Sequence, residues 1–209
     1  MSKFLNYLDE YKASKDFFEK NKNKGIRRFG YKFLEKFAKN QGQDKFYGLF
    51  IKRILNILNI NLNSYENFKI LEIGCGSGWA MSFQSSKVKY IAIDKYDNYK
   101  DFFNSKGIDF FKCDIEKEDL PLEENSINLV LMNHVIEHIK DPDILLIKLK
   151  KIIKKNGYLY IRCPDIELVK NKFWNDYTHV KPYTKLSIKQ LHDVHSFKKV
   201  FLINSEWRT

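Results

Sequence analysis

Residues 69 to 79 read Lys69-Ile70-Leu71-Glu72-Ile73-Gly74-Cys75-Gly76-Ser77-Gly78-Trp79, a short apolar run with one acid that ends in three alternating glycines. This pattern predicts a buried strand that turns sharply into a helix over residues 78–86. Glycine permits positive φ and lets a ligand lie against the backbone, and a helix behind the turn would offer free N–H groups. The spacing is G-x-G-x-G and differs from the G-x-G-x-x-G of dinucleotide enzymes. The stretch therefore predicts a turn that holds a small molecule.

From residue 67 onward, strand-like and helical patterns alternate. The expected strands are residues 69–73, 89–93, 109–112, 127–132, 158–163 and 199–203. The expected helices are residues 78–86, 99–105, 142–155, which Asp141 caps and Asn156-Gly157 ends, and a helix up to about His195 that a Ser187-x-x-Gln190 capping box opens. Such alternation indicates a Rossmann-like, doubly wound and mostly parallel α/β sheet.

Residues 1–66 differ from the rest of the chain because they show helical spacing and no strand-like alternation. We expect two or three helices there, with breaks near residues 21–25 and 40–43. This helical extension precedes the Rossmann-like domain of residues 67–209. Its aromatic stripe is expected to pack against that domain, and the alternative is a lid over the substrate cleft.

Bulk composition excludes several classes of protein. The chain has 209 residues, three widely spaced cysteines and a formal net charge of +11. An odd number of cysteines in apolar contexts argues against a disulfide framework and for reduced thiols. Neither a membrane-spanning run nor a secretory signal is apparent, so we expect a soluble, cytoplasmic protein. The lysines are spread along the chain, which weakens a nucleic-acid interpretation, although residues 20–39 form a denser basic patch.

Two acids follow the second and third expected strands. Asp94 stands at the end of the second strand, where an acid accepts hydrogen bonds from ribose hydroxyls in nucleotide-binding folds. Combined with the glycine turn in one βαβ unit, it gives a fairly specific signal. Asp114 ends the third strand and is placed to receive an adenine amino group, with a capping role as the alternative.

These motifs, in their order, resemble those of class I S-adenosylmethionine-dependent methyltransferases, in the branch of ubiquinone-biosynthesis enzymes and many glycan-cluster methyltransferases. The matching segments are residues 70–78, 93–94, 113–115, 120–130, 134–139 and 156–159. The family sheet has the strand order 3-2-1-4-5-7-6 with an antiparallel seventh strand. Only residues 204–209 follow the sixth expected strand. Either the seventh strand is missing or residues 198–203 take an unusual edge position.

The resemblance also implies roles for individual residues toward S-adenosylmethionine and its product S-adenosylhomocysteine. Glu72 would orient the glycine loop, and Gly74, Gly76 and Gly78 would surround the methionine part of the cofactor. Asp94 would bind the ribose, Asp114 and Ile115 the adenine, and Asn133 and His134 would lie beside the methyl donor.

The run His134-Val135-Ile136-Glu137-His138 also spells the H-x-x-E-H pattern of some zinc proteases. Its context argues against a metal, because the first histidine follows a strand closely and Asp141-Pro142 soon begins another helix. The family that the chain resembles commonly carries a Glu-His pair here without metal. A weaker idea gathers His134, His138 and Cys163, but nothing in the spacing requires it. We therefore expect no metal site.

A hydroxyl acceptor would need a general base, and the candidates are His138, His179 and His134. His179 belongs to residues 173–183, a segment that resembles one in glycan-related family members and would lie over the substrate side of the cleft. A structural hydrogen-bonding role is the alternative for this histidine.

The sequence predicts methyl transfer to a small-molecule or glycan acceptor, with O- or N-methylation favoured over C-methylation. One alternative is an RNA or protein methyltransferase that uses the basic N-terminal region. Another is a catalytically silent cofactor-binding module. A second copy of the chain that covers the edge of the sheet is a further hypothesis, tested by the solution mass.

Overall fold

The computed structural model describes residues 51–76, 78 and 80–197. The chain divides into two units at Ile60. Of the first unit the structure describes residues 51–60, and residues 51–57 of these are helical. The other helices expected in residues 1–66, the basic patch and the lid lie outside the described residues.

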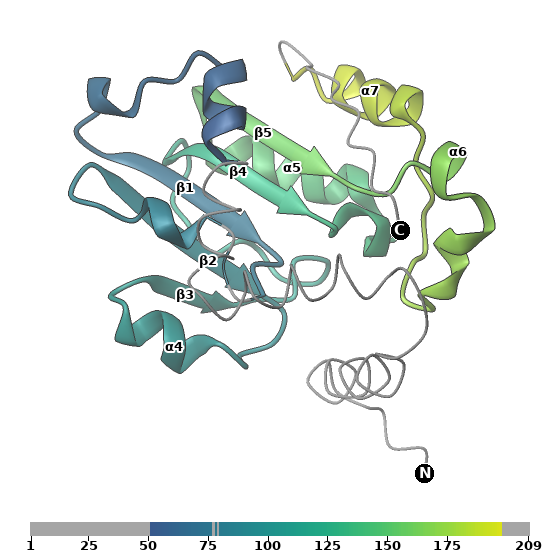
Figure 1. Cartoon of the computed structure of the whole chain (residues 1–209), viewed down its shortest axis with the longest axis horizontal. Coiled ribbons are helices and arrows are strands. Elements are labelled where there is room, and N and C mark those ends of the chain that lie inside the picture. Colours follow the sequence, from purple (N-terminus) through teal and green to yellow (C-terminus); the bar gives the residue numbers. More distant parts are fainter. Residues whose placement is uncertain (1–50, 77, 79, 198–209) are drawn as a thin grey trace, which may run out of the picture. The chain divides into compact units, whose positions relative to one another are not determined.

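The second unit contains a parallel sheet (Figure 1). Its strands are β1 (Phe68–Ile73), β2 (Val88–Asp94), β3 (Asp109–Lys112), β4 (Ile127–Asn133) and β5 (Ile153–Arg162). Within the described residues the sheet has five strands in the order β3-β2-β1-β4-β5, and all four pairings are parallel. This order confirms the Rossmann-like prediction. The sixth expected strand, residues 199–203, lies outside the described residues.

The helical elements of the described sheet domain are short. They are η1 (Leu62–Ser64), η2 (Met81–Phe83), α4 (Lys100–Ser105), η3 (Ile136–His138), α5 (Pro142–Ile152), α6 (Ile166–Val169), η4 (Lys170–Asn175) and α7 (Lys185–Val194). None of the helices in the described ranges combines the length and apolar composition that a membrane crossing requires.

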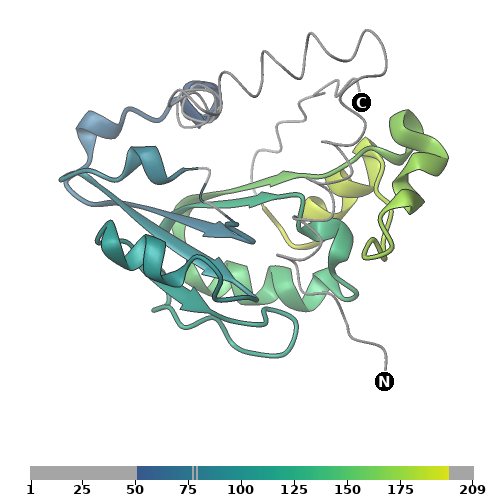
Figure 2. The same cartoon turned by 60° about the horizontal axis from the view of Figure 1, so that its bottom comes forward.

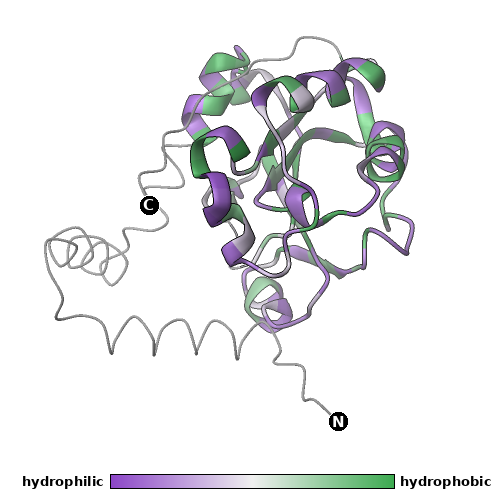
Figure 3. Ribbon diagram, turned by 90° about the vertical axis from the view of Figure 1, so that its right-hand side faces the viewer, coloured by the Kyte–Doolittle hydropathy of each residue, from purple (hydrophilic) through white to green (hydrophobic). Residues whose placement is uncertain are grey.

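The two faces of the sheet are covered by different helices. On one face, Phe103 of α4 stacks on Phe110 of β3 and contacts Tyr90 of β2. On the other, leucines of α5 join one buried cluster with apolar residues of β1, β2 and β4. Figure 2 shows α5 running along β4 and β5, and Figure 3 shows hydrophobic residues gathered on the interior strands. Because successive strand residues point to opposite faces, the apolar runs bury both sides of the sheet.

The helix expected over residues 78–86 is absent from the described part of that stretch, which holds only the short η2. Hydrogen bonds between side chains and backbone N–H groups tie this segment to the sheet instead. Glu72 accepts the Ala80 N–H at 3.0 Å, and Gln84 accepts the Tyr90 N–H of β2 at 2.7 Å. Ser85 accepts from Val88 at 3.2 Å. These contacts bind the segment to the sheet, so the prediction of a helix behind the glycine turn is wrong.

Three boundaries also differ from expectation. Helix α5 ends at Ile152 and not at Asn156-Gly157, because residues 153–157 already belong to β5. Strand β5 begins at Ile153 instead of residue 158, because buried Ile153 already pairs with Ile127. The register then shifts between the Ile127–Ile153 and Leu129–Tyr158 pairs. Gly157 lies in this stretch of β5, and an added Cβ there would lie 2.7 Å from the Ile153 side chain. Helix α7 begins one turn earlier than predicted, because Thr184 caps it and shares a capping box with Ser187.

Candidate functional site

Glu72 is the buried anchor of the glycine turn. The residue is 1% exposed. Its Oε2 accepts hydrogen bonds from the Ala80 N–H and from the Tyr90 hydroxyl, the latter at 2.7 Å. Burial, followed by the negative charge of Glu72, raises the pKa of Tyr90 well above its usual value. The hydroxyl therefore remains a donor, and the carboxylate fixes the segment on the far side of the turn.

Asp94 and Gly76 form the centre of the turn. The Gly76 N–H donates to Asp94 Oδ2 at 3.1 Å, and the Tyr96 N–H donates to Asp94 Oδ1 at 3.1 Å. Each carboxylate oxygen keeps capacity for a further hydrogen bond, as contact with ribose hydroxyls would require. Gly76 has a φ of +49°, and no described atom lies within 4 Å of the position of an added Cβ. As far as the described residues show, the turn thus presents an open backbone surface beside a carboxylate.

Gly74 brings the glycine turn against the end of β4. Its φ is +64°, and an added Cβ would lie 2.5 Å from a methyl carbon of Val135. A side chain at residue 74 would therefore require the Val135 side chain, next to His134, to move. Gly78 is also constrained, since its φ is +89° and an added Cβ would lie 2.9 Å from the Phe103 ring.

Asp114 lies at the end of β3, as predicted, but its carboxylate already has partners. Lys95 Nζ lies 3.2 Å and Lys117 Nζ 3.7 Å from Oδ2. Partial burial would raise the pKa of Asp114, but the hydrogen bond and charge of Lys95 outweigh it and lower that pKa. The side chain is 15% exposed, and the neighbouring Ile115 is buried. An adenine amino group would share this carboxylate with Lys95.

Asn133 is the last residue of β4 and His134 follows it, at the edge where the parallel strands end. The Asn133 side-chain oxygen accepts from Arg162 at 3.4 Å. His134 has a φ of +53°, a left-handed conformation that few residues other than glycine adopt. Its backbone N–H donates to the Arg162 carbonyl at 2.8 Å, and its Nδ1 lies 3.1 Å from Glu137 Oε1. The strained turn directs an imidazole with 41% side-chain exposure over this edge.

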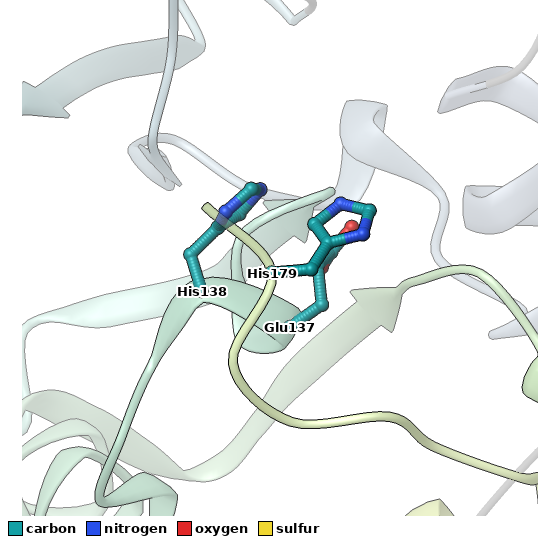
Figure 4. Close-up of side chains that lie close together, drawn as sticks. All are labelled: Glu137, His138 and His179. Carbon is teal, nitrogen blue, oxygen red and sulfur yellow. The ribbon is translucent and has the colours of Figure 1, made fainter. Parts of the chain in front are cut away.

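The other two histidine candidates come together beside Glu137 (Figure 4). His138 lies in η3, and His179 lies in the loop that follows η4. The backbone N–H groups of Val180 and Lys181 donate to the Glu137 carbonyl at 2.9 and 3.1 Å, which holds the loop against η3. The rings of His138 and His179 have centroids 4.8 Å apart. The structure thus joins two segments that are distant in the sequence.

Sequence reasoning did not assign a role to Glu137, which is fully buried. The H-x-x-E-H pattern was the signal that could have found it. The three-residue η3 confirms that the long helix of a zinc protease is absent there. Cys163 is a free thiol, as are Cys75 and Cys113. Burial, followed by the charge of Glu137, raises the pKa of Cys163 to about 12, so it remains a neutral thiol.

Comparisons with known proteins agree with this geometry. Phosphoethanolamine N-methyltransferase 1 of Zea mays is 29% identical over 116 residues, which is 48% of this chain and 22% of that protein. A malonyl-[acyl-carrier protein] O-methyltransferase of Calditerrivibrio nitroreducens is 28% identical over 108 residues, 52% of this chain and 42% of that protein. The matches thus span less than half the length of these two relatives.

A solved structure of a SAM-dependent methyltransferase from Archaeoglobus fulgidus has the same fold. Its TM-score is 0.60 at 20% identity, and the match covers 79% of this chain and 74% of that one. The sequence family described as a methyltransferase domain matches residues 16–200. The chain therefore belongs to this methyltransferase-domain family.

Proposed function

We propose that this chain transfers a methyl group from S-adenosylmethionine to a hydroxyl or amine group of a small-molecule or glycan acceptor. The observation that carries the proposal is the open surface at Gly76, whose N–H is fixed by the Asp94 carboxylate. The family membership supports the donor. The names of the two relatives, one an O- and one an N-methyltransferase, support the acceptor classes.

The residues at the turn fit the cofactor. In this proposal, Glu72, Gly74, Gly76 and Gly78 hold its methionine part, and Asp94 binds its ribose. Asp114 and Ile115 contact the adenine, and Asn133 and His134 lie beside the donor methyl group. The bound cofactor supplies a methyl group that its sulfonium has already activated. The protein therefore has to position the acceptor and exclude water.

A hydroxyl acceptor also has to lose a proton, and His134 is the best oriented of the three candidate bases. Its Nδ1 faces the buried Glu137 carboxylate, which can hold the ring and stabilise the protonated form. Nε2 is then the atom that takes the proton. His138 and His179 remain candidates that share the same cluster.

Binding of the donor is tested by thermal unfolding. Saturating S-adenosylmethionine or S-adenosylhomocysteine, at about 100 times the Kd, should raise the Tm of the parent chain by roughly 5 to 10 °C. Asp94→Ala should abolish most of this rise, because Gly76 and Tyr96 lose their acceptor. Asp109→Ala is the matched control, since Asp109 pairs with Lys89 on the surface. Absence of a rise in the parent chain would overturn the donor assignment.

The acceptor requires a separate measurement. The chain is incubated with isotopically labelled donor and with metabolite, glycan, RNA and protein fractions, and products are identified by a one-methyl mass increase. Labelling in the metabolite or glycan fraction is expected. Labelling confined to RNA or protein would overturn the acceptor class while leaving the donor assignment intact.

A further inference from the structure

Glu137, His138 and His179 form a group of metal-ligating side chains. One ligand atom from each residue lies within 4.8 Å of the other two (Figure 4). Glu137 and His138 belong to η3, which follows the carboxyl end of β4, and His179 belongs to the loop after η4. Figures 1 and 2 place η4 beyond the carboxyl ends of β4 and β5. This is the edge where open α/β sheets bind their ligands.

Hydrogen bonds fix the tautomers of both histidines. His179 Nδ1 lies 2.7 Å from the Phe173 carbonyl, and His138 Nδ1 lies 3.1 Å from the Thr178 carbonyl. The Thr178 hydroxyl also lies 3.0 Å from His138 Nδ1, but its hydrogen is directed to Asp176 at 2.6 Å. All these oxygens therefore accept, so each Nδ1 carries the proton. In the neutral rings the lone pair is left on Nε2, and this is the arrangement found in metal-bound histidines.

Glu137 contributes a buried carboxylate oxygen to this group. The residue is 0% exposed, and Oε1 lies 3.1 Å from His134 Nδ1. Among the described residues, Oε2 has no hydrogen-bond partner. A buried carboxylate oxygen without a partner is costly, and such an atom commonly marks the place of an ion. A cation bound between Glu137 and the two imidazoles would remove that cost.

The cluster is also held in place before any ion arrives. Val180 and Lys181 donate to the Glu137 carbonyl, and Phe173, whose carbonyl orients His179, is 1% exposed. Asp176 Oδ2 lies 3.8 Å from His179 Nε2, which is too far for a hydrogen bond. The His179 lone pair is therefore available to an ion.

We propose that Glu137, His138 and His179 bind one divalent transition-metal ion. Two imidazole nitrogens and one carboxylate oxygen suit Zn²⁺, Fe²⁺, Mn²⁺ or Co²⁺, whereas Mg²⁺ and Ca²⁺ prefer oxygen ligands. Three protein ligands leave at least one coordination position open, as in catalytic sites. This departs from the sequence expectation of no metal site, because that expectation did not place His179 beside the H-x-x-E-H segment.

The open position would take an oxygen atom of the acceptor, and this role rests on the proposed function. Coordination lowers the pKa of a hydroxyl group, which would ease the transfer of its proton to His134 Nε2, the proposed base, and leave an oxygen nucleophile. Metal binding itself does not rest on methyl transfer, so the two ideas can fail separately.

The test uses the full chain without a polyhistidine tag, stripped with a chelator and free of S-adenosylmethionine. Titration with Zn²⁺ by calorimetry, and with Co²⁺ by visible absorption, should show one ion per chain. His179→Ala and His138→Ala should each weaken the affinity by at least about 100-fold. Glu137→Gln keeps the shape of the side chain but removes its charge, and it should weaken binding as well.

His195→Ala is the matched control, because His195 lies at the end of α7, where it pairs with Asp143 at 2.7 Å. It should bind metal as tightly as the parent chain. Thermal unfolding of every protein with and without Zn²⁺ separates lost ligands from lost folding, since folded ligand variants should keep their Tm but lose the rise caused by the ion. The proposal is overturned if the parent chain binds no ion, or if the ligand variants bind as tightly as His195→Ala. A parent chain that binds S-adenosylhomocysteine but no metal would overturn this inference alone.

Discussion

Glu72→Ala is expected to lower the free energy of unfolding by about 2 to 5 kcal/mol, the largest effect that we expect from any single substitution outside the hydrophobic core. The change leaves the Ala80 N–H and the Tyr90 hydroxyl without their acceptor in a buried environment. It also releases the segment that takes the place of the expected helix. Urea unfolding monitored by circular dichroism measures the effect.

Two control variants distinguish the loss of the buried hydrogen bonds from the loss of an acidic side chain alone. Glu72→Gln keeps one side-chain oxygen as an acceptor and should cost less than Glu72→Ala. Glu66→Ala removes an exposed acid close to the start of β1 and should change stability by no more than about 0.5 kcal/mol. If Glu72→Ala were as mild as Glu66→Ala, Glu72 would not be the anchor of the turn.

Gly76→Ala should reduce the affinity for S-adenosylhomocysteine at least about tenfold, or ~1.4 kcal/mol. The added methyl group would occupy the open surface where the proposed cofactor lies. Gly107→Ala is the matched control for the effect of the Gly76→Ala substitution on stability. Both glycines have positive φ, +49° and +66°, and neither has a described atom within 4 Å of the added Cβ. Each substitution should therefore cost a similar ~1 to 2 kcal/mol of stability.

Calorimetric titration with S-adenosylhomocysteine, together with urea unfolding, distinguishes the two effects. Gly107→Ala should bind the ligand as the parent chain does, because Gly107 lies in the turn between α4 and β3. Equal affinities for the two variants would place the cofactor away from Gly76 and would contradict the proposed cradle.

The sheet could be predicted because short stretches of sequence indicate each strand. Runs such as Ile70-Leu71 and Leu129-Val130-Leu131 are buried on both faces, and Gly74 and Asp94 mark the ends of β1 and β2. The helix after Gly78 could not be excluded in the same way. Its absence depends on a carboxylate in the preceding strand and on Gln84 and Ser85, whose side chains bind the next strand.

The candidate site could likewise be predicted only in part from short stretches of sequence. Asp94 and Asp114 could be named from their places after strands, but the Lys95 ion pair that already occupies Asp114 could not. His138 and His179 were both candidates as bases. Their proximity depends on hydrogen bonds from Val180 and Lys181 to the Glu137 carbonyl, which no short sequence pattern encodes.

The burial of Cys75 gives the glycine turn a built-in kinetic reporter. The residue is 1% exposed, and burial, followed by the charges of Asp94 and Glu72, raises the pKa of its thiol far above the usual value. Alkylating reagents attack the thiolate, so modification of Cys75 requires local opening of the turn. The alkylation rate, resolved by peptide mass spectrometry from the rates at Cys113 and Cys163, therefore measures how often the turn opens. A ligand that closes the turn must slow that rate without any label being introduced.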